Sequence, residues 1–198
     1  MFNFWGSTSE GGRNEYHEKS IEKISGGGAE EAQHQYLLSK GMKEGKSCHI
    51  YSYNGIDGGL PWLITIGDDV TISSGVRILT HDASTNVVGC GTKLGRVDIG
   101  NNVFIGCGSI VLCNTKIGDN VVVGAGSVVA HDLESDAVYA GNPARKICTI
   151  DEYREKYETL RQSRPRLDDI RPWNTWGEAS EKEKQQMSLL LEGQEGFF

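Results

Sequence analysis

A six-residue repeat runs through the middle of the sequence and constrains its fold more than any other feature. Every sixth residue from position 99 to position 129 is aliphatic: Ile99, Ile105, Val111, Ile117, Val123 and Val129. The residue that follows each of them is in most cases a glycine or an alanine. An upstream block keeps the same spacing with Leu60, Ile66, Ile72 and Ile78. Self-similarity at a fixed period is typical of repeat architectures.

Each hexad predicts one short strand followed by one corner. A second inward position lies two residues before each aliphatic residue, as the alternation of side chains along a strand requires. Three residues after each aliphatic residue stands a residue of a type that tolerates positive φ: Asn102, Gly108, Asn114, Asn120, Gly126 and Asp132. Three such corners close a coil of about 18 residues, and the inward aliphatic side chains of successive coils stack. The repeat therefore predicts an all-β chain, a parallel β-helix shaped as a triangular prism.

Composition narrows the class of protein further. The chain has 198 residues, with 20 Lys+Arg against 27 Asp+Glu and a net charge of -7, which argues against a nucleic-acid binder driven by bulk charge. We expect no membrane span and no secretion signal, because the apolar stretches are interrupted and the start lacks basic residues. The odd number of cysteines, without C-x-x-C spacing, predicts free thiols in a reducing cytoplasm and no metal site: Cys48, Cys90, Cys107, Cys113 and Cys148.

The repeat does not extend to either end of the sequence. We expect an N-terminal extension over residues 1–41 with a short helix at Ala29–Lys40, and a β-helix domain over residues 42–150. Residues 151–198 carry 8 basic and 11 acidic side chains, whereas residues 97–148 carry only 8 charged side chains altogether. This predicts a C-terminal helical tail with helices near Asp151–Arg161 and Ser180–Leu191.

The six-residue rhythm breaks once. From Ile78 to Ile99 is 21 residues, which is not a multiple of six, so residues 80–96 must leave the coils as a loop. His81 stands at the base of this loop. Loops that project from a rigid scaffold often carry function, and a neutral imidazole is well matched to removing a proton from a hydroxyl.

The repeat also resembles a known family. The [LIV]-G-x4 run, with Gly141-Asn142-Pro143-Ala144-Arg145 after it, resembles the hexapeptide-repeat acyltransferases over about residues 42–150, and the galactoside, maltose and polysaccharide O-acetyltransferase branch most closely. The resemblance implies coils that wind to the left, although parallel crossovers are generally right-handed. It also implies a homotrimer with active sites between neighbouring prisms, acetyl-CoA as co-substrate without a metal, and His81 as general base.

The same resemblance implies the remaining site residues. Acceptor contacts are expected from Asp82, Asn54, Asp57 and Phe104, although Asp82 could instead orient the imidazole or cap a turn, and Phe104 could be a packing residue. Contacts to coenzyme A are expected from Gly106, Gly124, Ala125, Ser127, Ala130, His131, Arg145 and Lys146. Here Ala130-His131 stands where relatives carry a Thr-Lys pair.

The stretch Leu63–Val76 leading into Thr80-His81-Asp82 looks like the capsular and O-antigen members of this branch. This implies direct transfer of an acetyl group to a saccharide hydroxyl in a cell-surface polysaccharide pathway. N-acetylation of an amino sugar or nucleotide sugar is the nearest alternative, and an acetylated Cys90 intermediate is another. A γ-type carbonic anhydrase would need three repeat-borne histidines, whereas only His81 and His131 lie in or beside the repeat. A non-enzymatic β-helix scaffold is the alternative from a different class.

Overall fold

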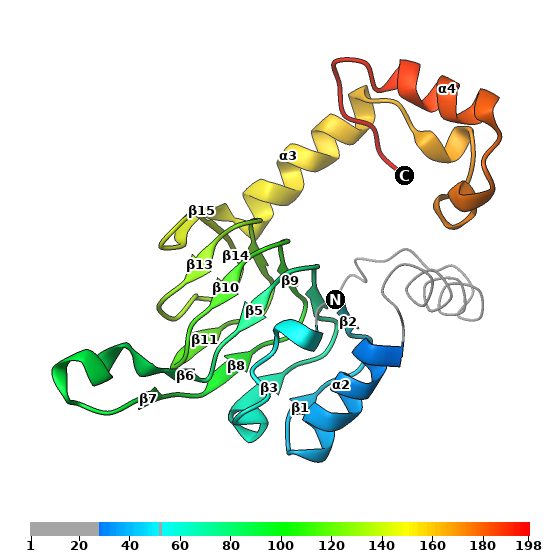
Figure 1. The fold of residues 1–198 in the computed structure, drawn as a ribbon. Helices are drawn as coiled ribbons and strands as arrows, with labels where there is room; N and C mark the ends of the chain where they lie inside the picture. Colours follow the sequence, from blue (N-terminus) through cyan, green and yellow to red (C-terminus); the bar gives the residue numbers. More distant parts are fainter. Residues whose placement is uncertain (1–27, 52) are drawn as a thin grey trace. The chain divides into compact units, whose positions relative to one another are not determined.

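The computed structural model describes residues 28–51 and 53–198. Short parallel strands dominate it and form three sheets (Figure 1). The first sheet contains β1 (Lys43–Glu44), β3 (Ile64–Ile66), β8 (Val97–Ile99) and β11 (Thr115–Ile117). The second contains β2 (His49–Ile50), β4 (Thr71–Ile72), β9 (Val103–Ile105), β12 (Val121–Val123), β14 (Ala137–Ala140) and the antiparallel β15 (Arg145–Thr149). The third contains β5 (Arg77–Ile78), β10 (Ile110–Val111) and β13 (Val128–Val129).

The chain visits the three sheets in turn, so that each circuit is one coil. The partner of Val97 in the first sheet is Thr115, which is 18 positions later. The same spacing joins Val103 to Val121 and Ile110 to Val128 in the other two sheets. This confirms the predicted hexads and three-strand coils of a mostly parallel β protein.

Buried aliphatic side chains fill the interior of the coils. All six aliphatic residues of the main repeat are at most 3% exposed, and so are Ile66, Ile72 and Ile78 of the upstream block. Leu60 is an exception, because it is only half-buried and Ile56 pairs with Ile78 in its place. The first coil is longer than the regular 18 residues, since Lys43 pairs with Thr65, 22 positions later.

The corners have the predicted backbone with one exception. Asn102, Asn114 and Asn120 adopt positive φ values of 52–60°. The predicted corner glycines, Gly108 and Gly126, also have positive φ, at 69° and 68°. Asp132 does not, because the last coil is two residues shorter at this corner: Val129 pairs with Val111, 18 positions earlier, whereas Leu133 bridges to Ile117, only 16 positions earlier. The next corner keeps the predicted backbone, since Asp136 lies beside Asn120 and has a φ of 60°. The corner amides also bond from coil to coil, since Asn102 donates to Asn120 at 2.8 Å and Asn120 donates to Asp136 at 2.7 Å.

The small residues after each aliphatic position let neighbouring coils approach closely. A Cβ atom added to Gly67 would lie 2.6 Å from the carbonyl oxygen of Gly100 and 2.7 Å from Asn101 Oδ1. We therefore expect Gly67→Ala to destabilise the coils by about 1–3 kcal/mol, because the adjoining backbone must shift. Thermal denaturation should show a melting temperature lower by roughly 2–12 °C. Gly28→Ala is the matched control because a Cβ there meets nothing within 4 Å; equal melting of the two variants would contradict the close stacking.

Helices occur at both ends of the repeat, near the predicted positions. They are α2 (Gly28–Ser39), α3 (Ile150–Ser163) and α4 (Glu181–Leu190). Ser180 caps α4 in a reciprocal arrangement with Glu183, which explains where this helix begins. None of the helices in residues 28–51 and 53–198 is both long and apolar enough to cross a membrane.

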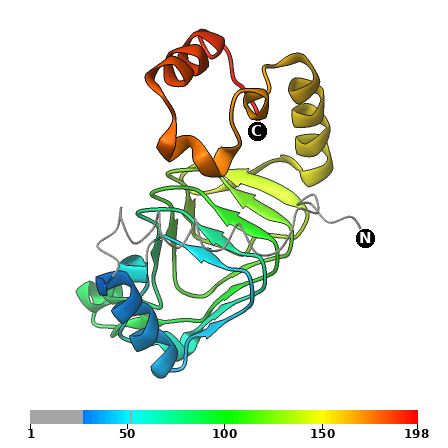
Figure 2. The same cartoon turned by 90° about the vertical axis from the view of Figure 1, so that its right-hand side faces the viewer.

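The structure divides into two compact units, one of which is Gly28–Arg154 and contains all the coils. Helix α2 belongs to this unit because it packs against the short 3-10 helix η1 (Tyr53–Gly55), whereas the sequence placed the domain boundary at residue 42. The other unit includes Glu155–Phe198, with the 3-10 helices η4 (Leu167–Asp169) and η5 (Trp173–Glu178). There the Leu167 amide donates to the Phe197 carbonyl at 2.8 Å and ties the end of the chain to η4. Figure 2 shows the stacked coils from a second direction.

Candidate active site

The break in the repeat is an antiparallel hairpin that projects from the stack of coils (Figure 1). Its strands are β6 (His81–Asp82) and β7 (Lys93–Leu94), joined through the 3-10 helix η3 (Ala83–Val88). His81 pairs with Leu94, and Asp82 accepts a hydrogen bond from the Ser84 amide at 2.8 Å, which starts η3. The extra chain makes Ile64 pair with Val97, 33 positions later instead of 18. His81 thus lies where the hairpin leaves the coils.

The carboxylate of Asp57 holds the imidazole of His81. Asp57 Oδ2 lies 2.5 Å from His81 Nδ1 and also accepts hydrogen bonds from the Thr80 hydroxyl at 2.5 Å and the Thr80 amide at 3.0 Å. The Gly59 amide donates to the other oxygen at 2.9 Å. Because a carboxylate accepts, Nδ1 carries the proton, and Nε2 of the neutral ring keeps its lone pair. The imidazole is therefore set to act as a base at Nε2.

Burial and hydrogen bonding act in opposite directions on Asp57. Its side chain is only 7% exposed, and this burial by itself would raise the pKa. The hydrogen bonds from the Thr80 hydroxyl, the Gly59 and Thr80 amides and the His81 ring together outweigh burial and lower the pKa of Asp57. Asp57 is therefore ionised at neutral pH and can stabilise a positive charge on the His81 ring. The His81 side chain itself is 48% exposed, so it can reach a substrate.

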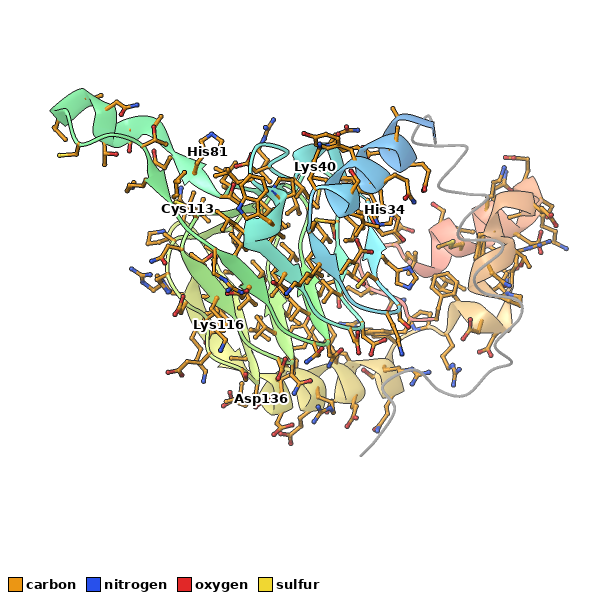
Figure 3. All side chains as sticks on the ribbon, turned by 90° about the horizontal axis from the view of Figure 1, so that it is seen from below. His34, Lys40, His81, Cys113, Lys116 and Asp136 are labelled. Atoms are coloured by element: carbon orange, nitrogen blue, oxygen red, sulfur yellow. The ribbon has the colours of Figure 1, made fainter. Side chains whose placement is uncertain are left out.

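A hollow of about 550 Å³ opens beside His81. Residues of the hairpin and of two successive coils line it: Leu79, His81, Asp82, Ala83, Lys93, Leu112, Cys113 and Ala130. Figure 3 labels His81 and Cys113, which face this region from the hairpin and from the corner after β10. The hollow thus combines one imidazole, two further charged side chains and several apolar side chains.

Asp82 forms an ion pair with Lys93 across the hairpin, at 2.6 Å. The hydrogen bond from Lys93, with those from Ser84, holds the pKa of Asp82 well below its usual range, and the same contact raises the pKa of Lys93. Asp82 therefore stays charged at the rim of the hollow. Of the roles predicted for it, the orienting contact to His81 is made by Asp57 instead.

Two other predicted acceptor residues lie away from the hollow. Asn54 is engaged by α2, since its side-chain amide donates to Glu30 at 2.6 Å. Phe104 lies in the middle of β9, is 43% exposed and has Thr71 and Val122 as its strand neighbours. Neither is among the residues that line the hollow in this chain.

Four of the residues predicted to contact coenzyme A lie at the corner between the second and third sheets. Gly106 is buried, Gly124 is half-buried and Ala125 is exposed. Ser127 is fully buried, and its hydroxyl donates to the Gly124 carbonyl at 2.6 Å and accepts from the Gly141 amide at 3.1 Å. The expectation that Ser127 contacts a ligand is therefore corrected: in this chain it has no accessible surface, and its polar groups join coils.

The other four residues predicted to contact coenzyme A lie at the hollow or on the exposed surface next to it. Ala130 lines the hollow itself, and His131 follows it. His131 Nε2 lies 2.6 Å from Arg145 Nη1 and 3.0 Å from the Ala144 carbonyl oxygen, and its Nδ1 lies 3.0 Å from the Asp132 carbonyl oxygen. Arg145 and Lys146 are both exposed at the start of β15. This arrangement presents an exposed guanidinium near the hollow that holds His81.

Sequence reasoning did not identify the role of Asp57 or the places of Thr80, Lys93 and Cys113 in the site. The sequence drew attention to Asp57 only because it lies in a Gly-rich stretch. Its contact with His81 could not be foreseen, because the two residues are 24 positions apart in the sequence. All five cysteines are free, and Cys90 is exposed on the hairpin away from the residues that line the hollow. In the described part of the chain, no group of three or more His, Cys, Asp or Glu side chains is placed to hold a metal ion.

Comparison with known proteins gives consistent results. Residues 96–131 match the family model described as bacterial transferase hexapeptide (six repeats). The chain is 45% identical to protein CapG of Staphylococcus aureus over 121 residues. The matched region covers 59% of this chain and 70% of that protein.

Several solved acetyltransferases also match the chain. Galactoside acetyltransferase in complex with coenzyme A is 29% identical, with a TM-score of 0.45 over 58% of each chain. Soybean serine acetyltransferase is 33% identical, with a TM-score of 0.43 over 54% of this chain and 40% of that one. A maltose O-acetyltransferase from Clostridium difficile 630 is 31% identical, with a TM-score of 0.40 over 55% of this chain and 66% of that one. The chain thus spans less than two thirds of each of these solved chains.

Proposed function

The chain belongs to the hexapeptide-repeat acyltransferase family, and on that basis we propose that it is an acetyl-CoA-dependent O-acetyltransferase acting on a saccharide hydroxyl. The observation that carries this proposal is the contact of 2.5 Å between Asp57 Oδ2 and His81 Nδ1 at the hollow. A free alcohol is a poor nucleophile at neutral pH, so transfer requires a positioned base. His81 is the one imidazole among the residues that line the hollow.

The residues of the chain suit direct transfer. Nε2 of His81 would take the proton of the acceptor hydroxyl as its oxygen attacks the acyl carbon. Asp57 would hold the Nδ1–H bond and stabilise the imidazolium while the carbon–sulfur bond breaks. His81 would then return the proton to the departing sulfur, which leaves the base ready for another turnover. Acetyl-CoA supplies the thioester that makes the acyl carbon reactive.

The residues present fit a coenzyme with a thiol arm and phosphates. Arg145 and Lys146 are exposed cations that would meet phosphate groups, and Ala130 connects their neighbour His131 to the hollow. Gly124 and Ala125, which are accessible, would border the arm as small residues, and the buried Gly106 would let the coil beneath Ala125 approach it closely. Asp82, paired with Lys93 at the rim, would contact the acceptor, and Asn54 and Phe104 would contribute only across an interface between subunits.

Further parts of the proposal rest on the same family membership. We expect the coils to wind to the left as a triangular prism, and we expect a cytoplasmic homotrimer whose active sites lie between neighbouring prisms. We infer the acceptor class from the likeness of residues 63–82 to capsular and O-antigen acetyltransferases. We therefore propose a role in the synthesis of a cell-surface polysaccharide.

An assay of thiol release from acetyl-CoA tests the proposal. The purified protein is incubated with sugars, amino sugars, nucleotide sugars and lipid-linked glycans, and products are identified by mass. We expect release with a saccharide that has a free hydroxyl, and a product that loses its acetyl group in mild base, as an ester does. A base-stable product would show N-acetylation instead. Absence of coenzyme A binding in calorimetry, together with no release across the panel, would favour a scaffold.

A further inference from the structure

The segment that carries Asp57 is not held by strand pairing alone. Residues 53–59 lie between β2 and β3, where Ile56 still pairs with Ile78 and the extra residues of the first coil follow it. Asp57 is tied to the third sheet through its amide, which donates to the Ile78 carbonyl at 2.9 Å. The residues on both sides of it are bonded to helix α2.

The first of these contacts precedes Asp57 in the sequence. Glu30 of α2 accepts from the side-chain amide of Asn54 at 2.6 Å and from the Asn54 backbone amide at 3.2 Å. A carboxylate that accepts two hydrogen bonds from one residue fixes both the backbone and the side chain of that residue. Glu30 therefore fixes the chain three residues before Asp57.

The second contact joins α2 to Tyr53 through Glu44. Tyr53 donates to Glu44 Oε1 at 3.2 Å, and His34 of α2 lies 3.1 Å from Glu44 Oε2. The His34 and Tyr53 rings stack with centroids 4.2 Å apart. Burial, followed by the charge and hydrogen bond of Glu44, raises the pKa of Tyr53, so the phenol keeps the proton it donates. The Glu44 side chain is only 11% exposed, and the cluster is largely shielded from water.

The third contact follows Asp57. The hydroxyl of Tyr36, also on α2, donates to the Gly58 carbonyl at 3.3 Å. Two side chains of α2 also lie beside Gly58, since a Cβ added there would be in van der Waals contact with Gln33 and Tyr36, at 3.5 Å from each. Helix α2 therefore holds the chain on both sides of Asp57, at Asn54 three residues before it and at Gly58 directly after it.

We propose that helix α2 positions Asp57 and, through it, His81, so that turnover depends on helix residues that touch neither substrate nor the reacting atoms. This inference rests on the proposed function of His81. The residues that line the hollow come from the hairpin and the later coils, and α2 supplies none of those described (Figure 3 labels His34 on α2 and His81 at the hairpin). Glu30, His34 and Tyr53 are accordingly positioning residues.

Glu30→Ala and Tyr53→Phe test the proposal, with Gln35→Ala as the matched control. Gln35 is exposed on the same helix and bonds only along it, to Glu31 at 2.8 Å. We expect each test variant to lower kcat by about 2- to 10-fold, the worth of one or two hydrogen bonds, with KM little changed. Glu30→Gln keeps an oxygen for Asn54 and should recover most of the loss. The control should match the wild type.

Two readouts separate positioning from a loss of stability. Spectra of ¹⁵N-histidine-labelled protein report the hydrogen bond at His81 Nδ1 without any turnover, and we expect this signal to change in Glu30→Ala and Tyr53→Phe. In an Asp57→Asn background the same substitutions should lower kcat little further, because the carboxylate that Glu30 and Tyr53 help to position is already absent. An unchanged Nδ1 signal, or equal losses in both backgrounds, would overturn the proposal. Failure of the proposed function would appear differently, as wild-type protein without acetyl transfer.

Discussion

Replacing His81 with alanine is expected to lower kcat by about 10²–10⁴-fold, the usual contribution of a general base. The side chain removed is half-exposed and lies outside the buried core, so the melting temperature should stay close to that of the wild type. Steady-state acetyl transfer and thermal denaturation of the same preparation measure the two effects. The loss should appear mainly in kcat, because the imidazole acts on the hydroxyl proton and not on either substrate's affinity.

His49→Ala is a suitable control for this experiment. His49 is an exposed histidine of β2 and does not line the hollow, so its removal should leave turnover largely intact. If His81→Ala turned over at a rate close to the wild type, the general-base assignment would be wrong. Mass analysis of the protein after incubation with acetyl-CoA would then show whether Cys90 or another residue carries the acetyl group.

Asp57→Asn is expected to reduce kcat by roughly 10- to 150-fold, because a hydrogen bond to a charged group contributes about 1.5–3 kcal/mol. The amide oxygen can still accept from Thr80, but the charge that stabilises a protonated His81 is lost. The reaction rate and the melting temperature should be measured together, since the side chain is buried and one of its hydrogen bonds, from the Gly59 amide, loses its acceptor.

The matched control is Asp98→Asn. Asp98 pairs with Arg96 at 2.8 Å on the surface, where such pairs contribute little, and turnover should be retained. In the double variant of His81 and Asp57, the rate should be no lower than in His81→Ala, because the two residues act as a unit. Additive losses would show that Asp57 acts on something other than the imidazole.

The coils could be predicted because each part of the repeat has a local cause. Inward positions such as Ile105 and Ile117 must be apolar to be buried, and they are 0% exposed. Glycines after them allow close stacking, and asparagines such as Asn120 tolerate the left-handed corner. The sequence failed where the period changed, at Leu60 in the long first coil and at Asp132 in the short last one. At Leu60 the pairing register of the neighbouring coil gave the position to Ile56, and at Asp132 the loss of two residues changed the corner itself.

By itself, the sequence determined the repeat, the place of the hairpin and the presence of one histidine at its base. Only the tertiary structure decided what that histidine contacts. Asp57 reaches His81 because Ile56, directly before it, pairs with Ile78 near the edge where the hairpin leaves, and helix α2 holds residues on both sides of it. A periodic pattern arises from neighbours that recur at fixed spacing. Contacts between residues of irregular segments have no such spacing and depend on how the coils stack.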